Sequence, residues 1–106
     1  MATGFYGADL AATTNTTLAT VTASTTSVGT INLVNRNTSS VAIRVAVAAT
    51  GTPASSEYIE YDLTLTPKGT AGATYNNSGI IAQAGKNIVV YSDTANVTAS
   101  YWHIEE

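Results

Sequence analysis

The chain contains no cysteine among its 106 residues, and only 10% of its residues are charged. Without cysteine, a protein can form neither a disulfide framework nor a thiolate metal site. Soluble domains average about 25% charged residues, so this surface must consist mainly of threonine, serine, asparagine, glycine and alanine. Such a surface is weakly hydrated and is easily buried against a partner protein.

Basic residues are especially scarce, with four Lys and Arg against seven Asp and Glu and a net charge of −3. Because binding to nucleic-acid phosphates needs a concentrated basic surface, we expect no nucleic-acid partner. No segment reaches the about 20 consecutive apolar residues of a transmembrane helix. The first ten residues also lack the basic and apolar segments of a signal peptide. We therefore expect a soluble product that is made in a cytoplasm and has no membrane contact.

Hydrophobic residues make up 44% of the chain, and they recur with the period of two that is typical of strands. We predict strands over residues 16–23, 28–34, 41–48, 58–65, 73–82, 87–92 and 97–104. A bulge is expected at residues 76–79, and the strands at 28–34 and 41–48 are expected to pair through a hairpin loop at 35–39. About seven short strands without helical periodicity predict one all-β domain, an antiparallel β-sandwich of jelly-roll or immunoglobulin-like type.

The first fifteen residues have weaker periodicity and carry the adjacent aromatic residues Phe5 and Tyr6. We interpret residues 1–15 as an extended N-terminal arm and residues 16–106 as the sandwich domain. Two aromatic side chains on such an arm would anchor it on a neighbouring subunit. A frayed chain end is the alternative interpretation.

The clearest alternation lies at residues 41–48, where valines and Ile43 face one way while Arg44 and three alanines face the other. A strand face in water usually carries larger polar side chains. We therefore predict that this second face is covered by another protein chain. The predicted interface residues are Phe5, Tyr6, Ala42, Arg44, Ala46, Ala48, Tyr58 and Trp102.

Few residues suit catalysis or metal binding. His103 is the only histidine, and we expect it to be half-exposed and paired with a carboxylate, or else to form a pH-sensitive contact at a subunit boundary. Glu57, Glu60 and Asp62 form the one acidic cluster, and strand geometry places the last two about 7 Å apart. That spacing would suit a glycosidase pair or part of a Ca²⁺ site, but an ion pair with Arg44 is the expected role. We expect no enzymatic activity, no cofactor and no resident metal.

Three segments resemble a known class of protein. They are residues 32–47, the run Glu57-Tyr-Ile-Glu-Tyr-Asp62 and the run Ala84-Gly-Lys-Asn-Ile-Val-Val-Tyr-Ser92, followed by the terminal Glu105-Glu106. Together they resemble small structural proteins, and domains of larger ones, from tailed phages of marine and freshwater bacteria, including cyanophages. The resemblance covers residues 31–106. It implies a β-sandwich displayed on a virion, without indicating the part of the virion or any catalytic residue.

Composition, alternation and this resemblance together predict a virion structural protein. We expect a capsid decoration or cement protein that stabilises contacts between major capsid proteins on the capsid exterior, after assembly in the host cytoplasm. Its expected partners are the major capsid protein and further copies of itself, as a dimer or trimer. The alternative is a tail- or head-fibre-associated module that binds host surface glycans through Tyr58, Tyr101 or Trp102.

Overall fold

The structure is a computed structural model that describes residues 3–106. Its elements are β1 (Gly4–Leu10), β2 (Thr16–Thr20), β3 (Thr26–Asn35), β4 (Val41–Ala48), the short 3₁₀ turn η1 (Ser55–Glu57), β5 (Tyr58–Leu65), β6 (Thr74–Gln83), β7 (Asn87–Ser92) and β8 (Val97–Glu105). The predicted all-β class is confirmed. The structure has one strand more than the seven predicted, and this additional strand is β1.

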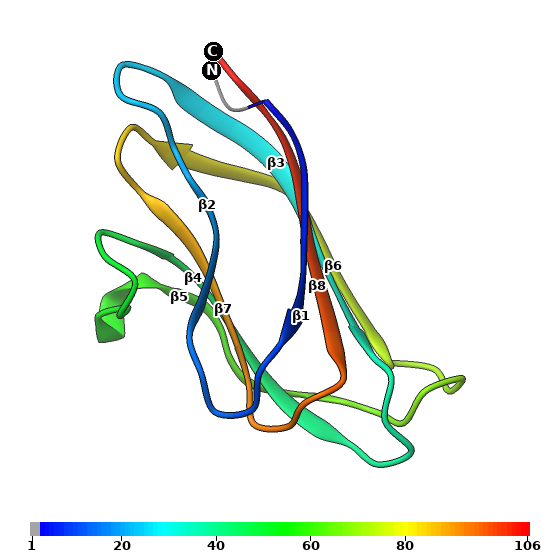
Figure 1. Ribbon diagram of the computed structural model, residues 1–106. Helices are drawn as coiled ribbons and strands as arrows, with labels where there is room; N and C mark the ends of the chain where they lie inside the picture. The colour runs from blue at the N-terminus through cyan, green and yellow to red at the C-terminus, as the bar shows by residue number, and fades with distance from the viewer. Residues whose placement is uncertain (1–2) are drawn as a thin grey trace.

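The strands form two four-stranded antiparallel sheets that pack as a sandwich (Figure 1). Sheet A has the strand order β1-β8-β3-β6, and sheet B has the order β2-β7-β4-β5. Consecutive strands alternate between the sheets at every step except from β4 to β5. Eight strands in this order form a jelly roll, one of the two sandwich types that the sequence left open.

The inward-facing side chains of both sheets form one hydrophobic core. Ile31 and Leu33 from sheet A and Ile43, Val45 and Ile88 from sheet B have no exposed surface. Full burial of such a side chain contributes about 1.5–3 kcal/mol to stability. The sequence prediction that Ile31 and Leu33 share an inward face, and that Ile43 and Val45 do likewise, is therefore confirmed.

The N-terminal residues form a strand and not the predicted extended arm. β1 pairs with β8 along its whole length, from Gly4 opposite His103 to Leu10 opposite Val97. The glycines of β1 hide its alternation in the sequence, because a glycine shows no facing preference. In the structure every second residue of β1 turns inward, and Leu10 at its end is buried. The sandwich thus begins at Gly4, and residues 1–2 of the predicted arm lie outside the described residues.

The predicted hairpin between β3 and β4 is wrong, since β3 lies in sheet A and β4 in sheet B. The segment between them crosses the sandwich, and the buried Asn35 stabilises the crossing. Its side-chain amide donates hydrogen bonds to the carbonyls of Ser39 and Thr66, each at 2.9 Å. Its side-chain oxygen accepts the N–H of Asn37 at 2.9 Å. An asparagine-rich link suits a tight turn and a crossing of this kind equally well.

β5 has the predicted bounds, but its side chains do not face as predicted. Its pairing with β4 shifts register between Ile43 and Val45 and again between Val45 and Ala46. The first shift is a bulge that places both Tyr61 and Asp62 opposite Arg44, and Asp62 has a positive φ of 54°. Bulges of this type reverse the alternation of a strand. Tyr61, expected to face inward, is therefore 58% exposed.

Candidate functional site

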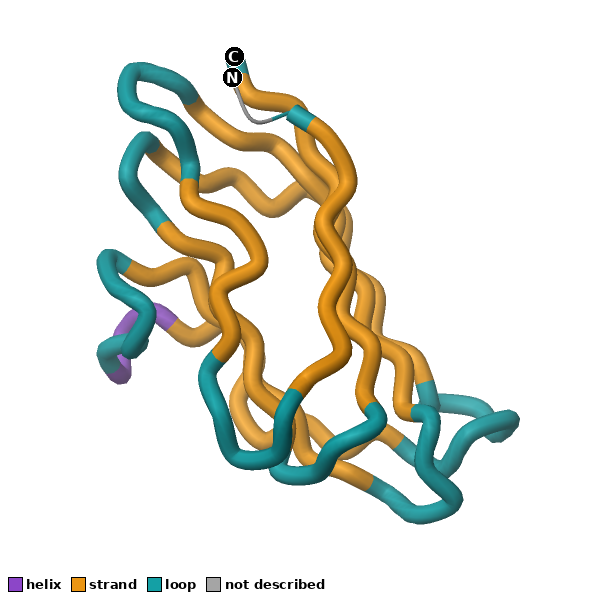
Figure 2. Tube along the Cα trace, viewed as in Figure 1, coloured by secondary structure: helices purple, strands orange, loops and turns teal. Residues whose placement is uncertain are grey.

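The outer face of sheet B, where the sequence predicts a contact with another chain, is covered by the protein itself around Ala46 and Ala48. Ala46 and Ala48 have no exposed surface. The link from β4 to β5 lies on the side of sheet B away from sheet A (Figure 2). Within this link, a Cβ on Gly51 would lie 3.6 Å from Thr17 Oγ1 on β2. Because β7 lies between β4 and β2, the link crosses above β7 and the alanines. The prediction that Ala46 and Ala48 contact another chain is wrong.

Glu57 holds this link in place. One oxygen of its carboxylate accepts the backbone N–H of Ala54 at 2.8 Å, and the other accepts the N–H of Ala49 at 2.9 Å. These two hydrogen bonds, that of Ala54 first, lower the pKa of Glu57 below its usual value. The carboxylate thus has a structural role at the edge of the sandwich.

Arg44 also lies on the outer face of sheet B and is enclosed by its neighbours. Its Nε donates a hydrogen bond to Asp62 Oδ1 at 2.7 Å, and this bond raises the pKa of Arg44. The guanidinium carbon lies 4.2 Å from the ring centroid of Tyr61 and 4.6 Å from that of Tyr91. The predicted ion pair of Arg44 with the acidic cluster is confirmed for Asp62. The Arg44 side chain is 26% exposed and Ala42 is half-buried, so the contact of these two residues with another chain stays a prediction.

The acidic cluster does not form a site. Glu57 binds the link, Asp62 binds Arg44, and the half-buried Glu60 is paired with Val45 in the register of β5 with β4. Within residues 3–106 no group of three or more His, Asp or Glu side chains is placed to hold a metal ion.

The outer face of sheet A is very different, because it exposes large apolar side chains. In the described part of the chain seven large hydrophobic residues are exposed, and five of them lie on this face. They are Phe5 (66% exposed), Val28 (46%), Ile81 (66%), Trp102 (41%) and Ile104 (57%). Phe5 lies opposite Trp102, Ile104 opposite Val28, and Val28 opposite Ile81. These five residues, here called the apolar patch, extend over all four strands.

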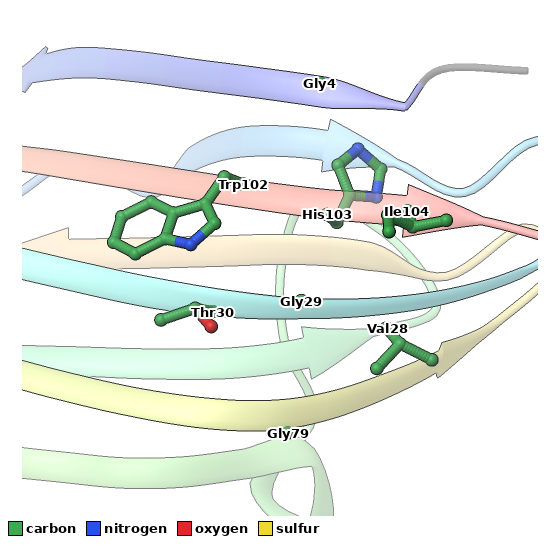
Figure 3. Close-up of a pocket in the computed structure, with 8 residues that line it drawn as sticks. All are labelled: Gly4, Val28, Gly29, Thr30, Gly79, Trp102, His103 and Ile104. Carbon is green, nitrogen blue, oxygen red and sulfur yellow. The ribbon is translucent and has the colours of Figure 1, made fainter.

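A shallow hollow of about 400 Å³ crosses the apolar patch. It follows a row of residues in which Gly4 lies opposite His103 and His103 opposite Gly29, with Gly79 at the bulge of β6 (Figure 3). The side chain of His103 points inward, as a Cβ on Gly29 would, so neither residue places a side chain over the backbone on the outer face. Figure 3 shows the rims of the hollow, which are formed by Trp102 and Thr30 on one side and by Ile104 and Val28 on the other.

A buried polar cluster lies beneath the hollow. Ser27 Oγ is 2.8 Å from Tyr101 Oη and 2.7 Å from His103 Nδ1, and Ser27 and Tyr101 have no exposed surface. Burial raises the pKa of Tyr101 above its usual value. His103 is only 4% exposed, and its Nε2 has no hydrogen-bond partner. The expectations of a half-exposed His103 and of a His103 contact at a subunit boundary are therefore wrong. Because the cluster is sealed from solvent, this serine–histidine contact cannot reach a substrate.

The predicted aromatic interface residues divide between the surface and the core. Phe5 and Trp102 are exposed and stack on one another, with ring centroids 6.1 Å apart and an interplanar angle of 17°. Tyr6 faces inward on β1 and is half-buried, with its ring 5.5 Å from that of His103. Tyr101, one of the predicted glycan-binding residues, is fully buried and cannot contact a sugar.

Tyr58 lies on the other sheet, beside the covering link. It is half-buried and packs edge to face against Tyr61, with ring centroids 4.9 Å apart. These two rings, with Pro53 and Ser55, line a second hollow of about 540 Å³. Tyr58 therefore does not join Phe5 and Trp102 in one surface.

Three residues of the apolar patch escaped the sequence interpretation, although a signal for each was present. Ile81 directly follows the buried Ile80, and adjacent residues of a strand face opposite sides. In the same way, Val28 and Ile104 are out of phase with the buried residues of their strands. Apolar residues at outward positions on neighbouring strands predict an exposed patch only when the strand order is known.

Within residues 3–106 no helix is long and apolar enough to cross a bilayer. Comparisons of the chain with models of known protein families, with curated proteins and with solved structures found no match.

Proposed function

We propose that this protein is a structural component of a phage virion, a capsid decoration or cement protein that stabilises contacts between major capsid proteins on the capsid exterior. The apolar patch is the observation that carries the proposal, since a contiguous exposed apolar surface is typical of a protein–protein interaction site. The resemblance of residues 31–106 to phage structural proteins supports the choice of partner. The jelly roll fits as well, because it is a frequent architecture of viral capsid domains.

The electrostatics of the patch favour burial against a protein. Among the outward positions that the structure describes on the strands of sheet A, Asp9 is the one charged side chain, and it is paired with Arg36. A partner that covers this face therefore desolvates almost no charge, which avoids the cost of burying charged groups in an interface. The gain is about 25 cal/mol for each Å² of apolar surface removed from water. The basic residue Lys68 does not change this balance, because it lies in an exposed turn outside the patch.

Decoration of a capsid is a mechanical role. A copy that binds across the joint between two capsid subunits adds its interface energy to the work needed to separate them. The uncharged patch provides this energy without depending on salt, since exposed charge pairs are screened within about 8 Å at physiological ionic strength. We expect decorated capsids to withstand heat better than bare ones, and we expect this difference to persist at high ionic strength.

The test uses capsids prepared without this protein. Purified protein is added, and bound and free protein are separated by sedimentation. We expect saturable binding and a higher temperature of capsid disruption. Trp102→Ser should weaken the binding at least about 30-fold, the loss typical of a central interface residue. Ile59→Ser is the matched control, because Ile59 and Trp102 are both 41% exposed and Ile59 lies on β5, outside the patch.

Two results would refute the proposal. One is a wild-type protein that does not bind such capsids at any concentration. The other is an equal loss of binding for Trp102→Ser and Ile59→Ser, because the patch would then have no special part in binding.

A second candidate function is a glycan-binding module of a tail or head fibre. The observation that favours it is the hollow formed by Tyr58 and Tyr61 with Pro53 and Ser55, because aromatic rings beside a few polar groups are typical of small-ligand sites. Saccharide binding that is lost in Tyr61→Ala, together with no effect of the protein on capsid disruption, would favour this candidate over decoration.

A further inference from the structure

We infer that the first partner of the apolar patch is a second copy of this chain, so that two copies pack patch against patch about a twofold axis. The inference rests on the proposed function for the premise that the patch is an assembly surface. It adds the identity of the partner in the free protein, before any capsid is reached. Because one face cannot contact two partners at once, the dimer must open before the patch binds a capsid.

The shape of the patch is self-complementary. The hollow runs across the strands between two rims, one with Trp102 and Thr30 and the other with Ile104 and Val28 (Figure 3). Trp102 and Ile104 are outward side chains two residues apart on β8, so the two rims lie about 7 Å apart. The hollow between the rims is therefore about as wide as one row of side chains. A twofold axis between them would place a rim of each copy in the hollow of the other, as an isologous interface requires.

Charge does not oppose this association. Each copy has a net charge of −3, so two copies repel one another weakly at long range. The acids near the middle of the chain, Glu57 and Asp62, belong to the β4–β5 link and to sheet B, on the other side of the sandwich. Asp9 on sheet A is neutralised by Arg36. The surface that two copies would share is therefore neutral on both sides.

The area of the face matches that of a stable dimer. Four strands at about 4.8 Å spacing, with about ten residues at a rise of about 3.3 Å, form a face of about 600 Å² in flat projection. Protruding side chains such as Phe5 and Ile81, each 66% exposed, add to the accessible area. A standard interface buries about 800 Å² on each partner. Two such faces in contact are thus large enough to form a specific dimer.

The test measures the mass of the purified full chain in the absence of capsids, by analytical ultracentrifugation over a range of concentrations. We expect a reversible species of twice the 10.9 kDa chain mass. Val28→Lys should raise the dissociation constant at least about 30-fold, because it places a charge at the centre of the shared surface. Ile59→Lys should leave it unchanged, since Ile59 is similarly exposed but lies on sheet B. Circular dichroism checks that each variant is folded, and Ile81→Lys replaces Val28→Lys if the latter is not.

A wild-type chain that stays monomeric at all concentrations would overturn the inference. A dimer that both patch variants leave intact would overturn it as well. These results are separate from the capsid experiment. If the protein is a monomer that binds capsids, the dimer inference is refuted and the decoration proposal stands. If the protein is a dimer that does not bind capsids, the dimer inference stands and the decoration proposal is refuted.

Discussion

Gly29 illustrates how a single residue controls the core packing beneath the apolar patch. A Cβ at this position would lie 2.6 Å from Tyr101 Cζ and 2.7 Å from His103 Cβ. These distances are shorter than any normal contact, and both neighbours are buried in the core. The glycine therefore lets the side chains of Tyr101 and His103 fill the core directly beneath the hollow of the apolar patch.

We expect Gly29→Ala to lower the free energy of unfolding by about 1–3 kcal/mol, because the added methyl group must displace packed side chains. Urea denaturation followed by circular dichroism measures the change. Gly7→Ala is the control in the same sheet, since its Cβ would meet its nearest atom, Phe5 Cε1, at an ordinary 3.4 Å. Equal stability of the two variants would contradict this explanation of Gly29.

Residue facing could be predicted from the sequence wherever a strand is regular. In β4 the residues Val41, Ile43 and Val45 are buried as expected. In β5 the expectation failed for Tyr61, because a bulge changes the alternation and Asp62 adopts a backbone conformation that the pattern of side chains does not reveal. A bulge depends on which strand lies alongside, so the sequence of one strand cannot disclose it.

Among the elements, the link at residues 49–57 has the largest effect on the surface. The small side chains of Ala46 and Ala48 correctly indicate that something approaches their face. The approaching segment belongs to the same chain, whereas the sequence interpretation assigned it to another. Local sequence reveals that a strand is covered, but the course of a surface loop depends on tertiary packing such as the approach of Gly51 to Thr17.

This link should loosen in acid. The pKa of Glu57 is lowered in the folded protein, so its contribution to stability is complete above the ordinary value of 4.5 and is lost as the pH falls through the folded-state pKa. We expect the amide signals of Ala49 and Ala54 in NMR spectra to move towards unstructured positions over this pH range, while those of the core strands do not. In Glu57→Gln these two amides should show no such titration. If they titrate equally in the variant, Glu57 does not hold the link.

The bounds of the strands were easier to predict than their partners. β5 and β7 begin and end where the sequence pattern predicts. β1 escaped prediction because Gly4 and Gly7 weaken its alternation. The pairing of β3 with β4 was wrong because the link at Asn35 joins the two sheets. Pairing in a jelly roll is dominated by contacts between distant segments, so neighbouring strands in the sequence are poor guides to it.

On the scale of the whole molecule, the two outer faces of the sandwich differ in how far the chain itself covers them. The chain folds its own link over sheet B, and it leaves the apolar patch of sheet A open. The residues of the candidate site that the sequence did identify, Phe5 and Trp102, both lie in this open face. Of the others from the same prediction, Tyr6 faces inward on β1, and the rest lie on sheet B. Knowledge of the strand order was needed to separate these two sets.

Trp102 allows the open face to be tested directly, because it is the only tryptophan of the chain and is 41% exposed in a single copy. Its fluorescence can be quenched with acrylamide in dilute protein, in concentrated protein and on capsids. We expect strong quenching in the dilute protein, and weaker quenching with emission at shorter wavelengths once copies associate or bind capsids. Equal quenching under all three conditions would show that Trp102 stays in water, which would contradict the role of the apolar patch in assembly.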